Sequence, residues 1–165
     1  MKTLYLIRHG KAEEHSFFKR DFERNLVDKG IERSNLIADK LINQLVPSQK
    51  ILLISSIANR ALQTAKIFCE KIGYPIDNIQ LESSIYEAHY LDVLNVVNQV
   101  SDDIDVVLIF GHNPGLSFLT NYICNSYIDL KTSHVAKVNL EKGFNFSEVS
   151  GRTGYLEKVI TELVD

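Results

Sequence analysis

Short, continuously apolar runs alternate along the chain with longer segments in which apolar residues recur at helical spacing. The runs that read as strands span residues 4–7, 51–54, 79–81 and 106–110. The segments that read as helices span residues 30–45, 58–72, 91–100 and 116–124. In the first of these, Ile37, Leu41 and Leu45 repeat every four residues and predict one buried stripe. This alternation predicts an α/β fold, a three-layer α/β/α domain with a mostly parallel central sheet.

Two further regions complete the predicted organisation. Residues 135–140 and 144–149 read as a hairpin around Gly143, and residues 155–164 read as a closing helix. Residues 11–27 are charged and mixed, which indicates a surface loop. We expect its phenylalanines, Phe17, Phe18 and Phe22, to pack down in part as anchors of the loop; the alternative is a patch that docks a partner. With no repeat or linker, residues 1–165 are expected to form a single domain.

Composition narrows the class of protein. The 165 residues are 45% hydrophobic and 24% charged, enough for a core without disulfides or metal. A net charge of −3 gives no nucleic-acid footprint. Cys69 and Cys124 lack metal-ligand spacing and are expected to be buried free thiols. No apolar run is long enough for a signal peptide or a membrane span, so we expect a cytoplasmic protein without membrane partners.

Polar residues that suit phosphoryl chemistry follow the predicted strands, directly or in the next turn. They are Arg8, His9, Arg60, Glu87, His112 and Asn113. The carboxyl ends of parallel strands lie at one edge of a sheet, where open α/β folds bind ligands. The strand assignments therefore predict that these side chains converge.

The residue types indicate a reaction. The guanidinium groups of Arg8 and Arg60 suit a tetrahedral oxyanion, and the helix that begins near Pro114 adds free backbone N–H groups. Positive neighbours would keep His9 neutral, and a neutral imidazole can attack phosphorus. Glu87 could hold a proton for the leaving group. Because no acidic cluster is available for magnesium, the sequence predicts phosphoryl transfer through a phosphohistidine, with no metal and no cofactor.

Four motifs carry a resemblance to a known family. Leu6-Ile7-Arg8-His9-Gly10 resembles the signature of the histidine phosphatase superfamily, which includes the cofactor-dependent phosphoglycerate mutases. The block from Ser56 to Ala65 is similar to its Ser-x-x-x-Arg-Ala-x-Gln-Thr-Ala stretch, and Gly111-His112-Asn113-Pro114 is similar to its second-histidine motif. Asp21-x-x-Arg24-x-Leu26-x-x-x-Gly30 resembles a stretch of the small SixA-type phosphohistidine phosphatases, with Asn25 in place of the usual proline.

The resemblance implies a phosphoglycerate mutase-like fold and a role for each matching residue. His9 would be the nucleophile, Arg8 and Arg60 would clamp the phosphoryl oxygens, and His112 would bind and stabilise the transferring group. Glu87 stands where the family often places its acid/base carboxylate, although some SixA-type members lack one. Arg24 and Asn113 are further candidates for binding the substrate.

Chain length bears on the substrate. Residues 88–110, between the glutamate and second-histidine motifs, provide room for about one helix and one strand. A large capping insertion is therefore not expected, and an open site suits a phosphorylated protein, such as one resembling a histidine phosphotransfer domain. The alternatives are a phosphatase acting on a small phosphate ester and a non-catalytic phosphoprotein-binding module. The binding module would hold phosphate but never form a phosphoenzyme.

Each candidate also has a plainer interpretation. His9 could be a satisfied histidine at a strand end, and His112 could cap the following helix. Glu87 could be a solvated loop residue, and Arg24 could brace the loop. Ser56 is expected to hydrogen-bond its local turn. The other histidines, His15, His89 and His134, are expected at the surface.

Overall fold

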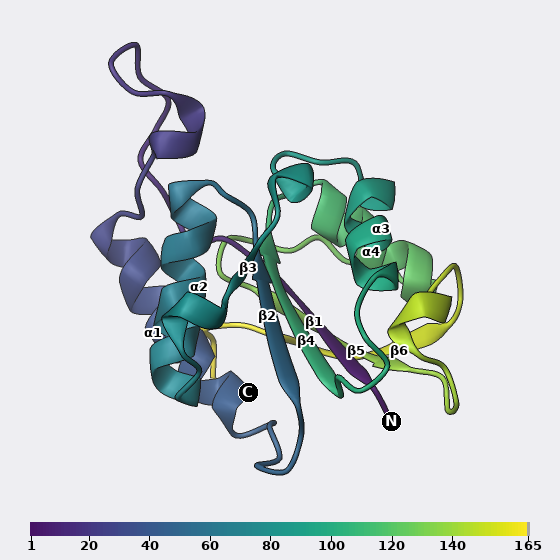
Figure 1. Cartoon of the computed structure of the whole chain (residues 1–165). Helices are drawn as coiled ribbons and strands as arrows, with labels where there is room; N and C mark the ends of the chain where they lie inside the picture. Colours follow the sequence, from purple (N-terminus) through teal and green to yellow (C-terminus); the bar gives the residue numbers. More distant parts are fainter. Residues whose placement is uncertain (165) are drawn as a thin grey trace.

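A six-stranded sheet organises the protein, whose computed structural model describes residues 1–164. The strands are β1 (Thr3–Arg8), β2 (Ile51–Ser55), β3 (Gln80–Leu81), β4 (Val106–Gly111), β5 (Val135–Leu140) and β6 (Gly154–Ile160). Their order is β3-β2-β4-β1-β5-β6 (Figure 1). The pairings among β3, β2, β4 and β1 are parallel, and those of β5 with β1 and β6 are antiparallel. The predicted mostly parallel sheet is confirmed.

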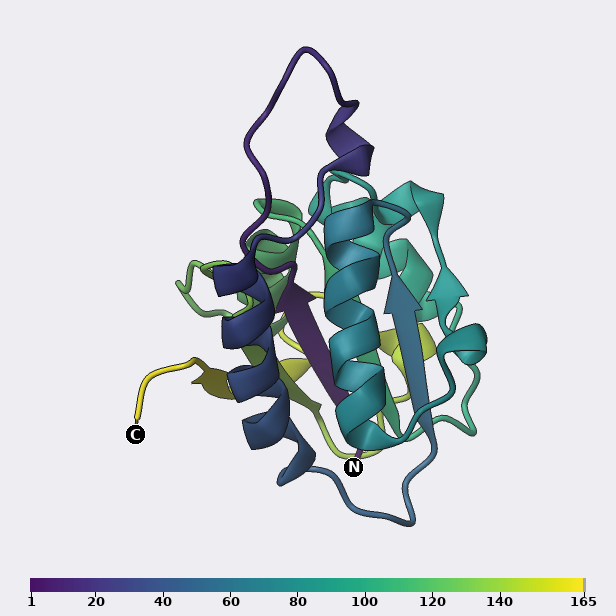
Figure 2. The same ribbon diagram turned by 90° about the vertical axis from the view of Figure 1, so that its left-hand side faces the viewer.

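Helices cover both faces of the sheet. They are α1 (Asp28–Ile42), α2 (Asn59–Ile72), α3 (Tyr90–Asn98) and α4 (Gly115–Cys124). Figures 1 and 2 show α1 and α2 on one face and α3 and α4 on the other. Because strand side chains alternate between faces, Tyr5 and Ile7 belong to the core beneath α1 and α2, whereas Leu4 and Leu6 belong to the opposite core. The three-layer prediction is therefore confirmed.

The C-terminal region differs from the prediction. Residues 154–160 form strand β6 instead of a helix, and Phe146–Glu148 is a single 3₁₀ turn instead of a hairpin strand. Lys137 pairs with Lys158 and Val138 with Leu156, which leaves Glu157 as an extra residue in β6. This irregularity breaks the alternation of the strand, so that Leu156, Val159 and Ile160 fall at helical spacing. That spacing caused the wrong prediction.

The charged loop projects from the carboxyl end of the sheet as an arm, defined here as residues 12–26 (Figure 2). An antiparallel bridge between Ala12 and Leu26 closes its base. The prediction that its phenylalanines pack down is wrong for Phe17 and Phe18, which are fully exposed, and Phe22 is half-buried. No residue that the structure describes covers the two side chains at the tip.

Two other expectations concern the cysteines and the membrane. Cys69 is a buried free thiol as predicted, while Cys124 is free but only half-buried. Within residues 1–164, no helix has the length and apolar character needed to cross a membrane.

Candidate active site

The two central strands bring the predicted histidines together. Arg8 is in register with Gly111 across the β1–β4 pairing, and the backbone N–H of His9 donates to the carbonyl of Gly111 at 3.0 Å. The next residue after β4 is His112, and its ring centroid lies 5.2 Å from that of His9. Both histidines are buried, with 9% and 4% of their surfaces exposed. The convergence expected from the strand ends is observed.

Only one ring nitrogen of His9, Nδ1, has a hydrogen-bond partner among residues 1–164. Its Nδ1 lies 2.8 Å from the carbonyl oxygen of Gly10, which can only accept a hydrogen bond. Nδ1 therefore carries the proton and Nε2 carries the lone pair. Burial lowers the pKa of His9 to about 4, and the charges of Arg60 and Arg8 lower it as well. Near neutral pH the ring is uncharged, as a nucleophile must be.

His112 is fixed from a different direction. Its Nε2 lies 2.8 Å from the hydroxyl of Ser56, which also accepts a hydrogen bond from the backbone N–H of Ala58 at 3.3 Å. Ser56 thus bonds its local turn as expected and also orients the histidine. Burial lowers the pKa of His112 to about 3, and the charges of His9 and Arg60 act in the same direction. The ring is directed to Ser56, not to the helix end that it was expected to cap under the plainer interpretation.

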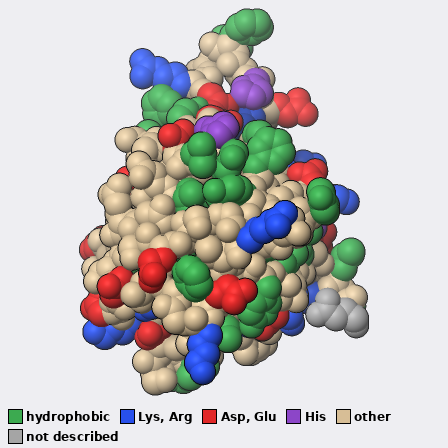
Figure 3. Space-filling model, turned by 90° about the vertical axis from the view of Figure 1, so that its right-hand side faces the viewer, with side chains coloured by type: hydrophobic (Ala, Val, Ile, Leu, Met, Phe, Trp, Pro, Cys, Tyr) green, Lys and Arg blue, Asp and Glu red, His purple; other side chains and the backbone are tan. Residues whose placement is uncertain are grey.

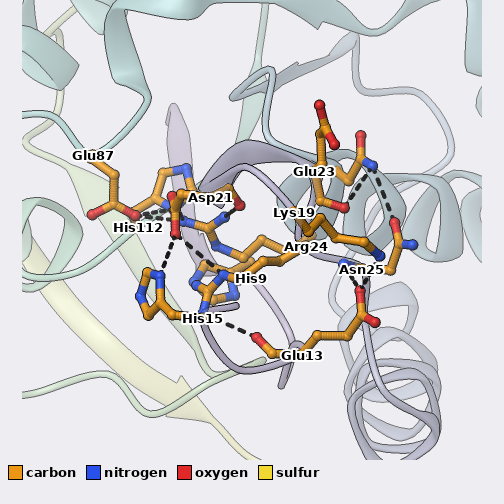
Figure 4. A network of polar contacts seen from close by, with 12 residues as sticks. His9, Glu13, His15, Lys19, Asp21, Glu23, Arg24, Asn25, Glu87 and His112 are labelled. Carbon is orange, nitrogen blue, oxygen red and sulfur yellow. Dashed lines mark hydrogen bonds and ion pairs between the residues drawn. The ribbon is translucent and has the colours of Figure 1, made fainter. Parts of the chain in front are cut away.

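Arg60, in the first turn of α2, lies beneath the site with only 1% of its surface exposed. Its Nη2 lies 2.6 Å from Oε1 of Glu87 and 3.1 Å from Oδ2 of Asp21, and its Nη1 donates to the Asp21 carbonyl at 2.9 Å. Carboxylates on two loops therefore compensate a buried guanidinium (Figure 4).

Three arginine nitrogens near the histidines have no hydrogen-bond partner among the described residues. They are the Nε atoms of Arg8, Arg24 and Arg60, all buried. Leaving a buried donor without a hydrogen bond costs about 1–3 kcal/mol, so donors of this kind usually bind a ligand or a water molecule. Arg8 and Arg24 line a depression of about 320 Å³ together with His9, Lys11 and Glu87. An anion with several acceptor oxygens would satisfy such donors.

Glu87 is held in an unusual backbone conformation. Its φ of 46° lies in the left-handed region, which non-glycine residues seldom occupy. The next residue, Ala88, packs against Gly115, where a Cβ atom would lie 2.5 Å from the Ala88 carbonyl oxygen. The Glu87 carboxylate lies 3.3 Å from Nδ1 of His112 in addition to its bond with Arg60. Glu87 is therefore bound to the site, although its side chain is 47% exposed.

Asn113 and Arg24 both line the depression, but their polar atoms are largely used within the protein. The Asn113 amide donates to the Leu130 carbonyl at 2.7 Å and accepts from the Ser117 hydroxyl at 2.8 Å. The same Leu130 carbonyl accepts from Arg8 Nη1 at 3.0 Å. Arg24 Nη1 donates to the Glu13 carbonyl at 3.0 Å, so it braces the arm. Its Nε makes no hydrogen bond among the described residues but lies 3.2 Å from Oδ1 of Asp21 as an ion pair.

Comparison with known proteins decides the family. The sequence model of the histidine phosphatase superfamily, branch 1, matches residues 4–124. The chain belongs to the histidine phosphatase superfamily. No curated protein sequence matches it significantly.

Solved structures of this superfamily share the fold. The protein histidine phosphatase SixA complexed with tungstate superposes with a TM-score of 0.78, at 21% identity over 97% of each chain. The SixA protein of Agrobacterium tumefaciens gives 0.76, at 22% identity over 96% of this chain and 97% of that chain. A mycobacterial glucosyl-3-phosphoglycerate phosphatase gives 0.67, at 12% identity over 100% of both chains. The fold is phosphoglycerate mutase-like and, like that of the SixA proteins, has no large capping insertion.

Asp21 is the site residue that sequence reasoning missed in this histidine phosphatase. Besides Arg60, its carboxylate contacts Arg24 Nε at 3.2 Å, His15 Nδ1 at 3.4 Å and the hydroxyl of Tyr86 (Figure 4). Burial favours its protonated form, but the Tyr86 hydrogen bond and the charge of Arg60 outweigh burial and lower its pKa. Its place in the Asp21-x-x-Arg24 motif was the available signal, and only Arg24 received a role from it.

The remaining histidines fall outside the pocket. His15 and His89 are exposed, as expected. His134 is buried, which contradicts the expectation, because its Nε2 pairs with Oε2 of Glu162 at 2.9 Å. Among residues 1–164, no three His, Cys, Asp or Glu side chains are grouped so that they could hold a metal ion.

Proposed function

We propose that this histidine phosphatase hydrolyses phosphohistidine on a protein, through a phosphoryl group held transiently on His9. The observation that carries the proposal is a buried, neutral His9 beside the Nε donors of Arg8 and Arg60. Among residues 1–164, neither of these donors nor Nε2 of His9 has a hydrogen-bond partner. The nucleophile and the oxyanion donors are thus arranged before any substrate arrives.

The first half-reaction forms the phosphoenzyme. The donors of Arg8, Arg24 and Arg60 bind the phosphoryl oxygens, and Nε2 of His9 attacks phosphorus. The bond from phosphorus to the substrate nitrogen breaks, and that nitrogen leaves with its electron pair and takes up a proton. Glu87 is half-exposed and can relay this proton from solvent.

The second half-reaction releases phosphate. A water molecule attacks phosphorus, and its proton passes to Glu87 or to solvent. The bond from phosphorus to Nε2 breaks, which frees inorganic phosphate and restores neutral His9. His112, close to His9 and fixed by Ser56, completes the pocket around the transferring group. Neither half-reaction requires a metal ion or cofactor.

Two observations bear on the substrate class. The depression is lined by side chains from the arm and from the strand ends, and no insertion covers it, so a phosphorylated side chain on a protein can enter. The SixA neighbour complexed with tungstate, a tetrahedral oxyanion, is a protein histidine phosphatase. The neighbouring glucosyl-3-phosphoglycerate phosphatase supports a second candidate, hydrolysis of small phosphate monoesters on the same fold.

The testing experiment measures phosphate release from a histidine-phosphorylated histidine phosphotransfer domain in excess EDTA. We expect rapid release by the wild type and none by His9→Ala. Release only from small phosphate esters would support the second candidate. Binding of tungstate with no turnover of any substrate would show a phosphoprotein-binding module instead, and turnover that EDTA abolishes and zinc restores would contradict the mechanism.

A further inference from the structure

The arm carries an apolar tip that the catalytic mechanism does not use. A bridge between Ser16 and Lys19 closes the tip, and Phe17 and Phe18 lie between these two residues. Both phenylalanines are fully exposed, Phe18 to 99%. In Figure 3 hydrophobic side chains cap the arm at its furthest point from the body of the molecule. Adjacent, fully exposed phenylalanines are unusual on a protein surface that has no partner.

The arm is built as an ordered support for this tip. The backbone N–H of Glu13 donates to the Asn25 carbonyl at 2.8 Å, and Lys19 Nζ lies 2.8 Å from Glu13 Oε1. Arg24 adds its bond to the Glu13 carbonyl from the other side of the arm. Because both sides of the arm are tied together, the phenylalanines are held away from the protein core.

The base of the arm is part of the candidate active site. Asp21 bonds Arg60 through both its carbonyl and its carboxylate, and Ala12 and Arg24 line the depression beside His9. A molecule seated on the tip therefore lies above the pocket. A small phosphate ester could fill the depression of about 320 Å³ without reaching the tip.

Charge indicates which molecule fits this combination. The depression is lined by the cationic groups of Arg8, Lys11 and Arg24 against one carboxylate, that of Glu87. An occupant that complements both features brings a phosphoryl dianion to the depression and an apolar surface to the tip. A folded protein with a phosphorylated side chain beside an apolar patch has both.

We propose that Phe17 and Phe18 dock the phosphorylated protein substrate; this inference rests on the proposed function and adds to it the surface that recognises the partner. The two rings pack against the apolar patch of the partner while its phosphorylated side chain enters the depression. The arm then acts on capture of the protein substrate and leaves the chemical step unchanged.

The test compares two substrates in a Phe17→Ser/Phe18→Ser double variant. The substrates are a histidine-phosphorylated histidine phosphotransfer domain and phosphoramidate, a small molecule with the same phosphorus–nitrogen bond. We expect kcat/KM on the protein to fall at least about tenfold, mainly through KM, because buried aromatic anchors dominate interface energies. Hydrolysis of phosphoramidate should change less than about twofold. The matched control is Ile76→Ser, an exposed apolar residue in the 3₁₀ turn Ile76–Asn78, which should leave both rates unchanged.

The outcomes separate this inference from the proposed function. If the wild type hydrolyses the phosphoprotein and the double variant does so equally well, the docking role is wrong and the proposed function stands. If the wild type hydrolyses only phosphoramidate, or neither substrate, the proposed function is wrong. The docking role is then wrong too, because it depends on that function. Dissociation of a wild-type dimer by the double substitution, with unchanged kinetics on the phosphoprotein, would assign the tip to self-association and overturn the inference.

Discussion

The floor of the site and the arm above it are built by different physical means. The floor consists of His9, His112 and Arg60. These residues are almost fully buried and lie at strand ends or in the first turn of a helix. The arm is exposed at its tip, lies outside the sheet and is held mainly by polar contacts. On the proposed function, the floor supplies the chemistry, which demands fixed geometry and low solvation, and the arm supplies contacts that a partner can reach. The junction between them is the pairing of Asp21 with Arg60.

The largest effect is expected at the floor. Replacing Arg60 with alanine removes a proposed phosphate donor and leaves Asp21 and Glu87 without their shared cation. We predict a fall in kcat/KM of about 100- to 1,000-fold, the usual cost of losing one preorganised oxyanion donor. Steady-state kinetics on phosphoramidate would measure it. Arg60→Lys is the control and should recover only part of the loss, because lysine keeps the charge but not the planar fork.

The junction should give an intermediate effect. Asp21→Asn keeps an acceptor for Tyr86 but removes the charge that orients Arg60 and Arg24. We predict about a tenfold loss in kcat/KM and a parallel loss of tungstate affinity, since a charged hydrogen bond is worth about 1.5–3 kcal/mol. Asp77→Asn, an exposed acid on the far 3₁₀ turn, should change neither quantity. Unchanged tungstate affinity in Asp21→Asn would show that the pairing of Asp21 with Arg60 does not couple the arm to the floor.

The pH dependence tests whether burial keeps the His9 ring uncharged. Because the pKa of His9 lies at about 4, kcat/KM should hold from pH 7 to about 5 and fall to half near pH 4, as the nucleophile takes up a proton. A fall centred near pH 6.5 would show that His9 titrates as if it were exposed and would contradict the buried floor.

The same pKa makes a prediction about stability. An unfolded histidine binds a proton below pH 6.5, whereas folded His9 does so only near pH 4. The unfolded state therefore binds more protons between these values, and the free energy of unfolding must fall as the pH drops from 6.5 to 4. His9→Asn should show a shallower fall over this range in urea denaturation.

The smallest effect is expected at the arm tip. Among residues 1–164 nothing covers the Phe18 side chain, so Phe18→Ser should change the free energy of unfolding by no more than about 0.5 kcal/mol. Thermal or urea denaturation would measure this change. A clearly larger destabilisation would show that the tip packs against the protein, as the sequence pattern suggested.

The contrast also explains what the sequence could predict. The floor was predictable because apolar runs locate the strands, and parallel strands place their next residues at one edge, which brought His9 to His112. The arm was not predictable, because the exposure of Phe17 and the contacts of Asp21 depend on the three-dimensional path of the loop. The same limit applies to His134, whose burial follows from its pairing with Glu162 far along the chain. In β6, one extra residue in the strand places the apolar side chains at helical spacing, and the sequence therefore predicted a helix.

The most direct test of the central claim is to trap the phosphoenzyme. The wild type would be mixed with a phosphotransfer domain carrying ³²P-phosphohistidine, quenched in alkali within milliseconds, and mapped by mass spectrometry. The account predicts an acid-labile, alkali-stable phosphoryl group on His9, absent from His9→Ala. Turnover by the wild type with label on another residue, or undiminished turnover by His9→Ala, would contradict it.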